Sequence, residues 1–210
     1  MNRRILLLNS LMFLLASFNI MARNCNDLFL KQYIVTNDTV VIKKLGHSFL
    51  KYHIQRDSVY TLEWGNELVE NTSKDTFEVL GSGVLGIIDN DEQTIILGQS
   101  CGTSCSRYVI LSLQFNSKEK EYLFAKAYDL ANHLVAFIPE DNNIFVRIEN
   151  FMTGQYMNII ESDLCPATIK GDCIDDIYFS KDSIIIKWQG KEWSNNKTDP
   201  KEIKLKIELR

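Results

Sequence analysis

The chain has 210 residues, of which 45% are hydrophobic, and its formal net charge at pH 7 is −4. This apolar content excludes an intrinsically disordered chain, and the length suits one domain with a sizeable core. The mildly acidic balance, with no basic cluster, argues against nucleic acid and anionic lipid as partners, because both require a positive footprint on the protein.

Residues 1–22, MNRRILLLNSLMFLLASFNIMA, have the layout of a secretory signal peptide. Two arginines precede an apolar run of about 14 residues, which fits the hydrophobic region of a signal peptide and is shorter than the roughly 20 residues of a membrane-spanning helix. We therefore predict cleavage after Ala22 and a single domain over residues 23–210. The protein should be secreted or periplasmic, with no stable membrane span after cleavage.

A lipoprotein is the minor alternative, because Cys25 closely follows the apolar run. Lipoprotein processing requires small residues before the cysteine, and this chain has Arg23 and Asn24 there. No other segment of the chain is long and apolar enough to span a bilayer.

From Leu28 onward the pattern is that of β-structure. Apolar runs rich in Ile, Val, Tyr and Phe alternate with polar turn clusters every 8–15 residues or so, a spacing typical of short antiparallel strands and hairpins. The clearest runs are 39–44, 59–64, 93–98, 107–115, 144–149, 183–188 and 203–209. The last of these alternates with period two, as a strand with one solvated face does. We predict an all-β domain.

A weak internal repeat bears on the architecture. The segments 33–44, 52–64 and 178–188 each read as a tyrosine-containing strand, an Asp-Ser or Asp-Thr turn and a β-branched strand. The turn aspartates Asp91, Asp141 and Asp182 have a spacing close to that of a four-stranded propeller blade. Hairpins with Asp in the turn also look alike for purely local reasons. A sandwich or barrel and a small propeller-like array therefore both stay open.

Cys101 and Cys105 flank a three-residue loop just before the strand-like run 107–115. This spacing places two cysteines across a tight hairpin, at a Cα separation that a disulfide accepts. Thioredoxin-like pairs are one residue closer and precede a helix, and a zinc site needs four ligands. We predict a disulfide staple, with Cys165 and Cys173 as a second bridge; pairing between the two sets, metal binding and redox activity are the alternatives.

Three short motifs carry a resemblance: 101-CGTSC-105, 137-FIPEDNNIFVRI-148 and 187-KWQGKEW-193. Together they make residues 93–193 similar to a group of uncharacterised secreted bacterial β-rich proteins with a CGT-x-C turn followed by Pro-acidic and Trp-Gly strand elements. This chain has Ser104 where that group often has Gly. The group has no known activity, so the resemblance implies a compartment and a fold class only.

Among the tryptophans, Trp193 is the best candidate for a contact residue, because it lies in the polar stretch 189–200. Exposed tryptophans on β-folds stack on sugar rings or anchor protein partners. Trp64 and Trp188 end apolar runs, and we expect both in the core.

Catalytic and metal-binding patterns are not distinct in this sequence. The three histidines have no Cys, Ser or Asp at a spacing that suggests a triad. The acidic clusters 89–92 and 172–176 lack the order of an EF-hand loop, and nothing singles out a glycosidase carboxylate pair. We predict no catalytic residue, no metal site and no cofactor.

We therefore expect a non-catalytic binding protein that recognises another protein, as an inhibitor or an envelope component. A glycan-binding module using Trp193 is the first alternative, and a hydrolase or redox enzyme with a dispersed site is the second. A glycan binder should show an exposed aromatic row beside polar side chains, and a protein binder should show an apolar surface patch.

Overall fold

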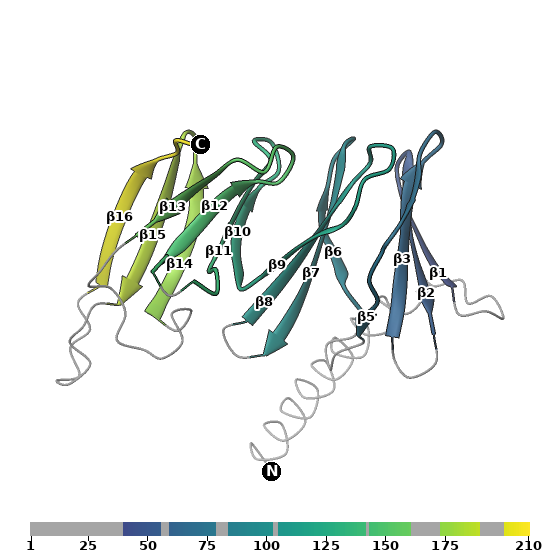
Figure 1. Cartoon of the computed structure of the whole chain (residues 1–210), viewed down its shortest axis with the longest axis horizontal. Helices are drawn as coiled ribbons and strands as arrows, with labels where there is room; N and C mark the ends of the chain where they lie inside the picture. Colours follow the sequence, from purple (N-terminus) through teal and green to yellow (C-terminus); the bar gives the residue numbers. More distant parts are fainter. Residues whose placement is uncertain are drawn as a thin grey trace, which may run out of the picture.

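The computed structural model describes residues 40–55, 59–78, 84–102, 105–141, 143–160, 173–189 and 200–210. The predicted signal peptide, its cleavage site and Cys25 lie outside these residues. Within them all regular secondary structure is β-strand. The strands form four antiparallel sheets that pack face to face in a row (Figure 1). The prediction of an all-β fold is confirmed.

Each sheet is a meander in which consecutive strands of the chain are neighbours. Sheet I contains β1 (Val40–Leu45), β2 (Ser48–Ile54), β3 (Val59–Asn66) and β4 (Glu70–Thr72), and the short β5 (Phe77–Glu78) also pairs with β3. Sheet II contains β6 (Gly86–Asn90), β7 (Thr94–Gly102), β8 (Cys105–Ser112) and β9 (Lys120–Leu123). Sheet III contains β10 (Ala125–Asp129), β11 (Leu134–Phe137), β12 (Val146–Asn150) and β13 (Tyr156–Ile159). Sheet IV contains β14 (Ile174–Ser180), β15 (Ser183–Gln189) and β16 (Pro200–Lys206).

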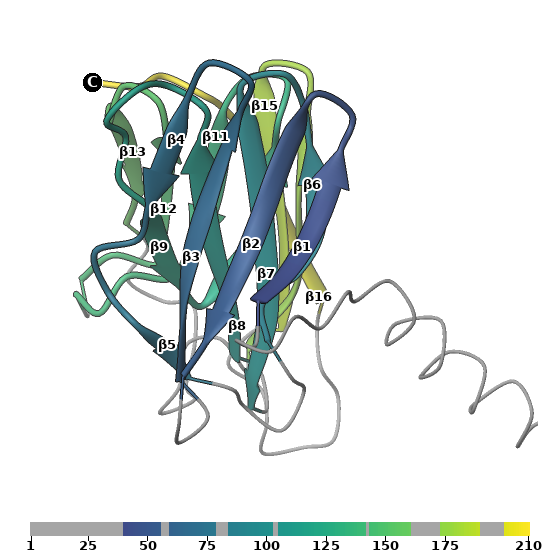
Figure 2. The same ribbon diagram turned by 90° about the vertical axis from the view of Figure 1, so that its right-hand side faces the viewer.

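A hydrophobic core fills each of the three spaces between neighbouring sheets. Trp64, Tyr52 and Leu97 belong to the core between sheets I and II, and Ile96 and Val135 to the core between sheets II and III. The third core, between sheets III and IV, includes Ile148, Ile186 and Trp188. Seen along the stack, the strands of successive sheets overlie one another (Figure 2). The stack is open, because the sheets at its two ends do not meet (Figure 1).

The outer faces of the two end sheets are charged. In β2, Leu50 and Tyr52 face the core, so Lys51 and His53 face outward, where both contact Glu63 of β3. In β15, Lys187 faces outward and lies 3.6 Å from Glu202 of β16. A polar outer face at each end is how stacked repeat proteins stay soluble and stop growing.

The architecture is a row of antiparallel sheets, none of which closes into a barrel, and it resembles the propeller-like alternative only in being an array of meanders. The repeat inferred from the spacing of Asp91, Asp141 and Asp182 is wrong at Asp141. Asp91 and Asp182 lie between the first and second strands of their sheets, whereas Asp141 lies between the second and third strands of sheet III. Because successive strands are antiparallel, these two kinds of turn lie at opposite ends of a sheet. Turn aspartates form the same local hydrogen bonds at either end, so their spacing was not a reliable period.

A different feature does repeat from sheet to sheet: the first strand of each of sheets II, III and IV contains a β-bulge. The extra residues are Ile88 in β6, Lys126 in β10 and Asp175 in β14. Bulges bend and twist a strand locally and are a common device on sheet edges, where they discourage pairing with another chain. Ile88 packs over Gly98, where a Cβ would lie 3.0 Å from the isoleucine Cγ2. The bulge therefore explains why β7 has a glycine at that position.

Candidate functional site

A groove of about 760 Å³ lies along the first strands of sheets II, III and IV. Its floor is β10 and the turn that follows, one wall comes from β6 and β8, and the other from β14. The lining residues are Asp89, Asp91, Tyr108, Lys126, Ala127, Tyr128, Asp129, Leu130, Ala131, Tyr178 and Phe179. The volume is within the range of small-molecule sites, about 300–1,000 Å³.

Two tyrosines from neighbouring sheets form the aromatic part of the groove. Tyr108 of β8 and Tyr128 of β10 meet edge to face, with ring centroids 5.8 Å apart and an interplanar angle of 80°. Both rings are half-buried and pack against the core between sheets II and III. Aromatic rings packed in this way present an apolar face to a ligand at little entropic cost.

The phenol groups of these rings stay neutral. Burial raises the pKa of Tyr108 above its usual 10.0. Burial also raises the pKa of Tyr128, and the charge of Asp89 and a hydrogen bond to that carboxylate raise it further. At physiological pH each phenol is therefore a hydrogen-bond donor and acceptor, and the Tyr128 hydroxyl donates to Asp89 across the boundary between sheets II and III.

Three carboxylates belong to the lining; Asp91 and Asp129 are fixed by their turns, and Asp89 lies within β6. The Asp91 Oδ1 accepts hydrogen bonds from the Gln93 and Thr94 N–H groups, both at 2.8 Å. Asp129 accepts from the N–H of Asn132 at 3.1 Å and from its side-chain amide at 2.7 Å. The Asp89 Oδ1 accepts from the N–H of Asn90 at 2.9 Å.

These hydrogen bonds come from neutral donors and leave the charges uncompensated. Among the residues that the structure describes, none of the three aspartates forms an ion pair. Lys126, the extra residue of the β10 bulge, is the one basic residue among the described residues that line the groove. The groove thus combines neutral aromatic donors with a negative electrostatic potential.

A smaller hollow of about 390 Å³ lies near β9 and the strand end of β11. Three of its polar side chains contact one another: the Tyr122 hydroxyl donates to Glu149 at 2.8 Å, and the Lys120 ammonium lies 3.9 Å from the same carboxylate. Because these groups are already paired, the larger groove is the better candidate for a ligand site.

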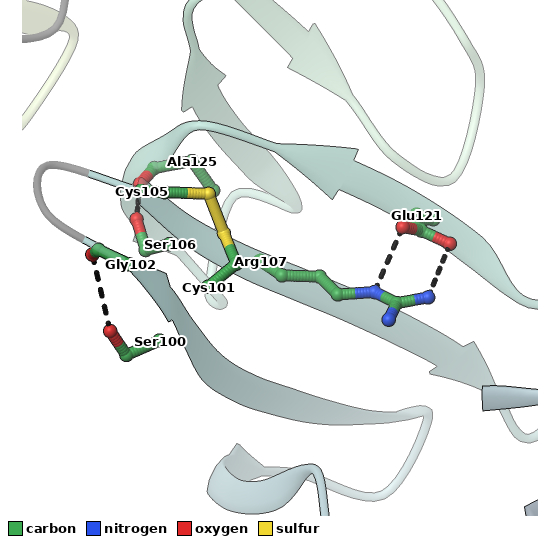
Figure 3. The surroundings of a disulfide bond; sticks show 8 residues. All are labelled: Ser100, Cys101, Gly102, Cys105, Ser106, Arg107, Glu121 and Ala125. Carbon is green, nitrogen blue, oxygen red and sulfur yellow. Dashed lines mark hydrogen bonds and ion pairs between the residues drawn. A yellow bond between two sulfur atoms is a disulfide. The ribbon is translucent and has the colours of Figure 1, made fainter. Parts of the chain in front are cut away.

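Cys101 and Cys105 are joined by a disulfide, as predicted, with their Cα atoms 5.1 Å apart (Figure 3). The hairpin turns on Gly102, whose φ of 131° is accessible to glycine and rare in other residues. The chain then continues as strand β8, so these cysteines do not stand at the start of a helix as a thioredoxin-like pair does. Next to the staple, Ser106 donates to the Ala125 carbonyl and Arg107 forms a bidentate ion pair with Glu121.

The other predicted site residues are only partly within the described chain. Cys165 and Trp193 lie outside it, so the contact role of Trp193 stays a prediction. Cys173 is buried at the start of β14 and is disulfide-bonded, but its partner lies outside the described residues, so the Cys165–Cys173 bridge also stays a prediction. Trp64 and Trp188 are buried in the core, as expected.

Sequence reasoning did not predict the groove: it noted Asp91 and Tyr178 only as parts of the repeat, and Asp89 and Asp91 only as members of the acidic cluster 89–92. Tyr108, Tyr128 and Asp89 are up to 39 positions apart, and only the stacking of sheets II and III brings them together. The available signal was weak: a tyrosine next to an aspartate at a strand end, as in Tyr128–Asp129, is also common in ordinary hairpins.

In the part of the chain that the structure describes, no helix is long and apolar enough to cross a membrane. Within the same residues, no three His, Cys, Asp or Glu side chains are arranged to hold a metal ion. Comparison with protein-family models, curated proteins and solved structures gives no match to this chain.

Proposed function

We propose that this protein is a non-catalytic binding protein of the cell exterior or periplasm, and that the groove along β6, β10 and β14 binds carbohydrate. The observation that carries the proposal is the row of half-buried tyrosine rings beside fixed carboxylates. It differs from the exposed aromatic row expected of a glycan binder, because these rings are half-buried, and it does not involve Trp193.

Carbohydrates have two kinds of surface, and the groove has a counterpart for each. Their C–H faces pack on aromatic rings, here Tyr108 and Tyr128. Their hydroxyls donate hydrogen bonds, for which carboxylate oxygens are strong acceptors. Asp91 and Asp129 keep lone pairs available, since each carboxylate has about four acceptor sites and its turn uses two. The volume suits a short oligosaccharide rather than a whole protein domain.

The fixed positions of the carboxylates favour binding over catalysis. Each of the three aspartates accepts a backbone hydrogen bond, and those of Asp91 and Asp129 shape their own turns. A glycosidase needs one carboxyl group held in its protonated form, through burial or a second charge. Nothing in the contacts of Asp89, Asp91 or Asp129 singles out one of them for that role.

The proposal is tested by screening the purified protein against soluble oligosaccharides, followed by calorimetry on those that bind. Tyr108→Leu and Tyr128→Leu should each weaken binding by about tenfold or more, because a lost ring face is worth roughly 1.5 kcal/mol. Tyr156→Leu is the matched control: this tyrosine lies on β13, the opposite edge of the same sheet from β10, and its loss should leave affinity unchanged. Near-ultraviolet circular dichroism checks that the variants are folded.

Failure of all oligosaccharides to bind would overturn the proposal. So would binding that survives both groove substitutions, since the ligand would then lie elsewhere on the protein.

A protein partner is the second candidate, because two large apolar side chains are exposed at strand turns. Leu68 is 92% exposed and Phe115 is 76% exposed. The Asn66 side chain fixes the Leu68 turn by accepting from two N–H groups, and Asn71 donates to the Gln114 carbonyl beside Phe115 at 3.0 Å. Exposed apolar side chains on turns whose backbone is fixed in this way are typical of contact surfaces.

This second candidate predicts that Leu68→Ser and Phe115→Ser leave stability unchanged and abolish capture of a partner from the native extracellular environment. Tyr156→Ser is the control, since it also removes an exposed ring, from another edge. If the double variant captured the same partner with equal yield, these two side chains would have no role in recognition.

The proposed location is tested separately by mass spectrometry of the exported protein with and without reduction. We expect a mature chain that begins at residue 23 and a single peptide containing bridged Cys101 and Cys105. An intact N-terminus, or a lipid on Cys25, would contradict the proposed processing.

A further inference from the structure

We infer that the groove along β6, β10 and β14 selects amine-bearing carbohydrates, that is, sugars with a free, protonated amino group, over neutral and acidic ones. This inference rests on the proposed carbohydrate-binding function and adds the chemical class of the ligand. It follows from the charges around the aromatic rings.

The charge balance of the lining is the first argument. Asp89, Asp91 and Asp129 face the groove together with the single basic residue Lys126. The three carboxylates receive hydrogen bonds from backbone amides, an asparagine side chain and a phenol, none of which carries a positive charge. Clefts lined by one sign of charge concentrate ligands of the opposite sign.

The aromatic rings are the second argument, and they are independent of the first. Cations bind over the faces of tyrosine rings through the ring quadrupole, and Tyr108 and Tyr128 are held edge to face at the groove. An ammonium group beside these rings would meet both the π-face and a carboxylate. A neutral sugar would use only the packing and hydrogen bonds, and a carboxylated sugar would be repelled.

The positions of the carboxylates favour a sugar over a free metal cation as the ligand. Asp89 lies near the end of β6, Asp91 just after it and Asp129 at the end of β10, so two neighbouring sheets contribute the carboxylates. They are not gathered around one point, and the described residues contain no three-carboxylate metal cluster. An extended ligand with an amine and several hydroxyls matches this distribution better than a bare ion does.

The experiment compares three tetrasaccharides of equal linkage by calorimetry: the oligomer of glucosamine, its fully N-acetylated form and the corresponding oligomer of glucose. At about pH 6 and low salt, we expect the glucosamine oligomer to bind about tenfold more tightly than the other two, as for one added charge interaction in a partly solvated cleft. The preference should shrink at about 0.5 M salt, where the Debye length is only a few ångströms.

Asp91→Asn is the informative variant, because asparagine retains the Oδ1 acceptor of the turn and removes only the charge. It should lower the affinity for the glucosamine oligomer about threefold to tenfold and leave that for the glucose oligomer unchanged. Asp141→Asn is the matched control: Asp141 Oδ1 accepts the same kind of turn hydrogen bond, from the Asn143 N–H at 2.9 Å, at the end of sheet III away from the groove.

The outcomes distinguish the inference from the function on which it rests. Equal affinity for the three oligomers, or an unchanged affinity in Asp91→Asn, overturns the amine preference and leaves carbohydrate binding in place. No binding of any oligomer overturns both. Binding of oligolysine with no binding of sugars also overturns both, in favour of a basic peptide as the ligand.

Discussion

The inner sheets and the end sheets of this stack differ in how their strands are buried. In β7 of sheet II, the consecutive residues Thr94–Leu97 are all buried, because both faces of the sheet meet a core. In β2 of sheet I, burial alternates along Ser48–Tyr52, because only one face meets a core. Continuous apolar runs are usually associated with parallel sheets between helices. Here they mark antiparallel strands between two other sheets.

Sheet IV refines this comparison. Although it is an end sheet, its central strand β15 has a buried run, Ser183–Ile186. Ile185 faces outward, between Tyr178 of β14 and Lys204 of β16 in the strand register. The apolar parts of such neighbours cover it, since long charged side chains bury their aliphatic stems. The burial pattern of a single strand therefore does not show whether its sheet lies inside the stack or at its end. That inference is reliable only when several strands of the sheet have the same pattern.

The largest expected effect tests the difference between inner and end strands directly. Ile95→Ala and Ile96→Ala, neighbours in β7, should each lower the free energy of unfolding by about 2–5 kcal/mol, because each side chain lies in a different core. In β2, Leu50→Ala should cost about as much, but its neighbour Lys51→Ala should cost about 1 kcal/mol or less. Urea unfolding of the four variants measures this. Equal costs for Leu50 and Lys51 would contradict the single-faced burial of sheet I.

The disulfide gives the next largest effect. It joins the ends of β7 and β8 where the hairpin leaves the cores, since Ser100 and Gly102 are exposed. Closing so short a loop restricts the unfolded chain little, so replacing both Cys101 and Cys105 by serine should cost about 2 kcal/mol or less. Amide hydrogen exchange should quicken near the hairpin and not at Ile95–Leu97. Faster exchange throughout sheet II would show that the staple supports the core itself.

The all-β class, the strands with the clearest apolar runs and the staple could be predicted from the sequence because their signals are local. The alternation in 203–209 and the spacing of Cys101 and Cys105 report on neighbours a few residues away. The groove could not be predicted, since Tyr128 reaches Asp89 only after two sheets have stacked. The aspartate repeat failed for a related reason: the hydrogen bonds made by Asp91 and Asp141 are alike, although their turns occupy different places in the meander.

The smallest effect concerns the charged outer face of sheet I. Burial alone would raise the pKa of Glu63, but hydrogen bonds from Lys51 and His53 and their positive charges outweigh it and hold the pKa below its usual 4.5. A carboxylate with a lowered pKa in the folded state stabilises the protein above its unfolded pKa, and that contribution is lost as the pH falls through the folded pKa. The free energy of unfolding should therefore fall more between about pH 5 and pH 3 in the wild type than in Glu63→Gln, by about 1 kcal/mol or less.

Urea unfolding at several pH values measures the difference, with Glu202→Gln on sheet IV as the control, because its pair with Lys187 is more exposed. Parallel curves for wild type and Glu63→Gln would mean that the outer face of sheet I is solvated like any other surface, and that charge there ends the stack without stabilising it.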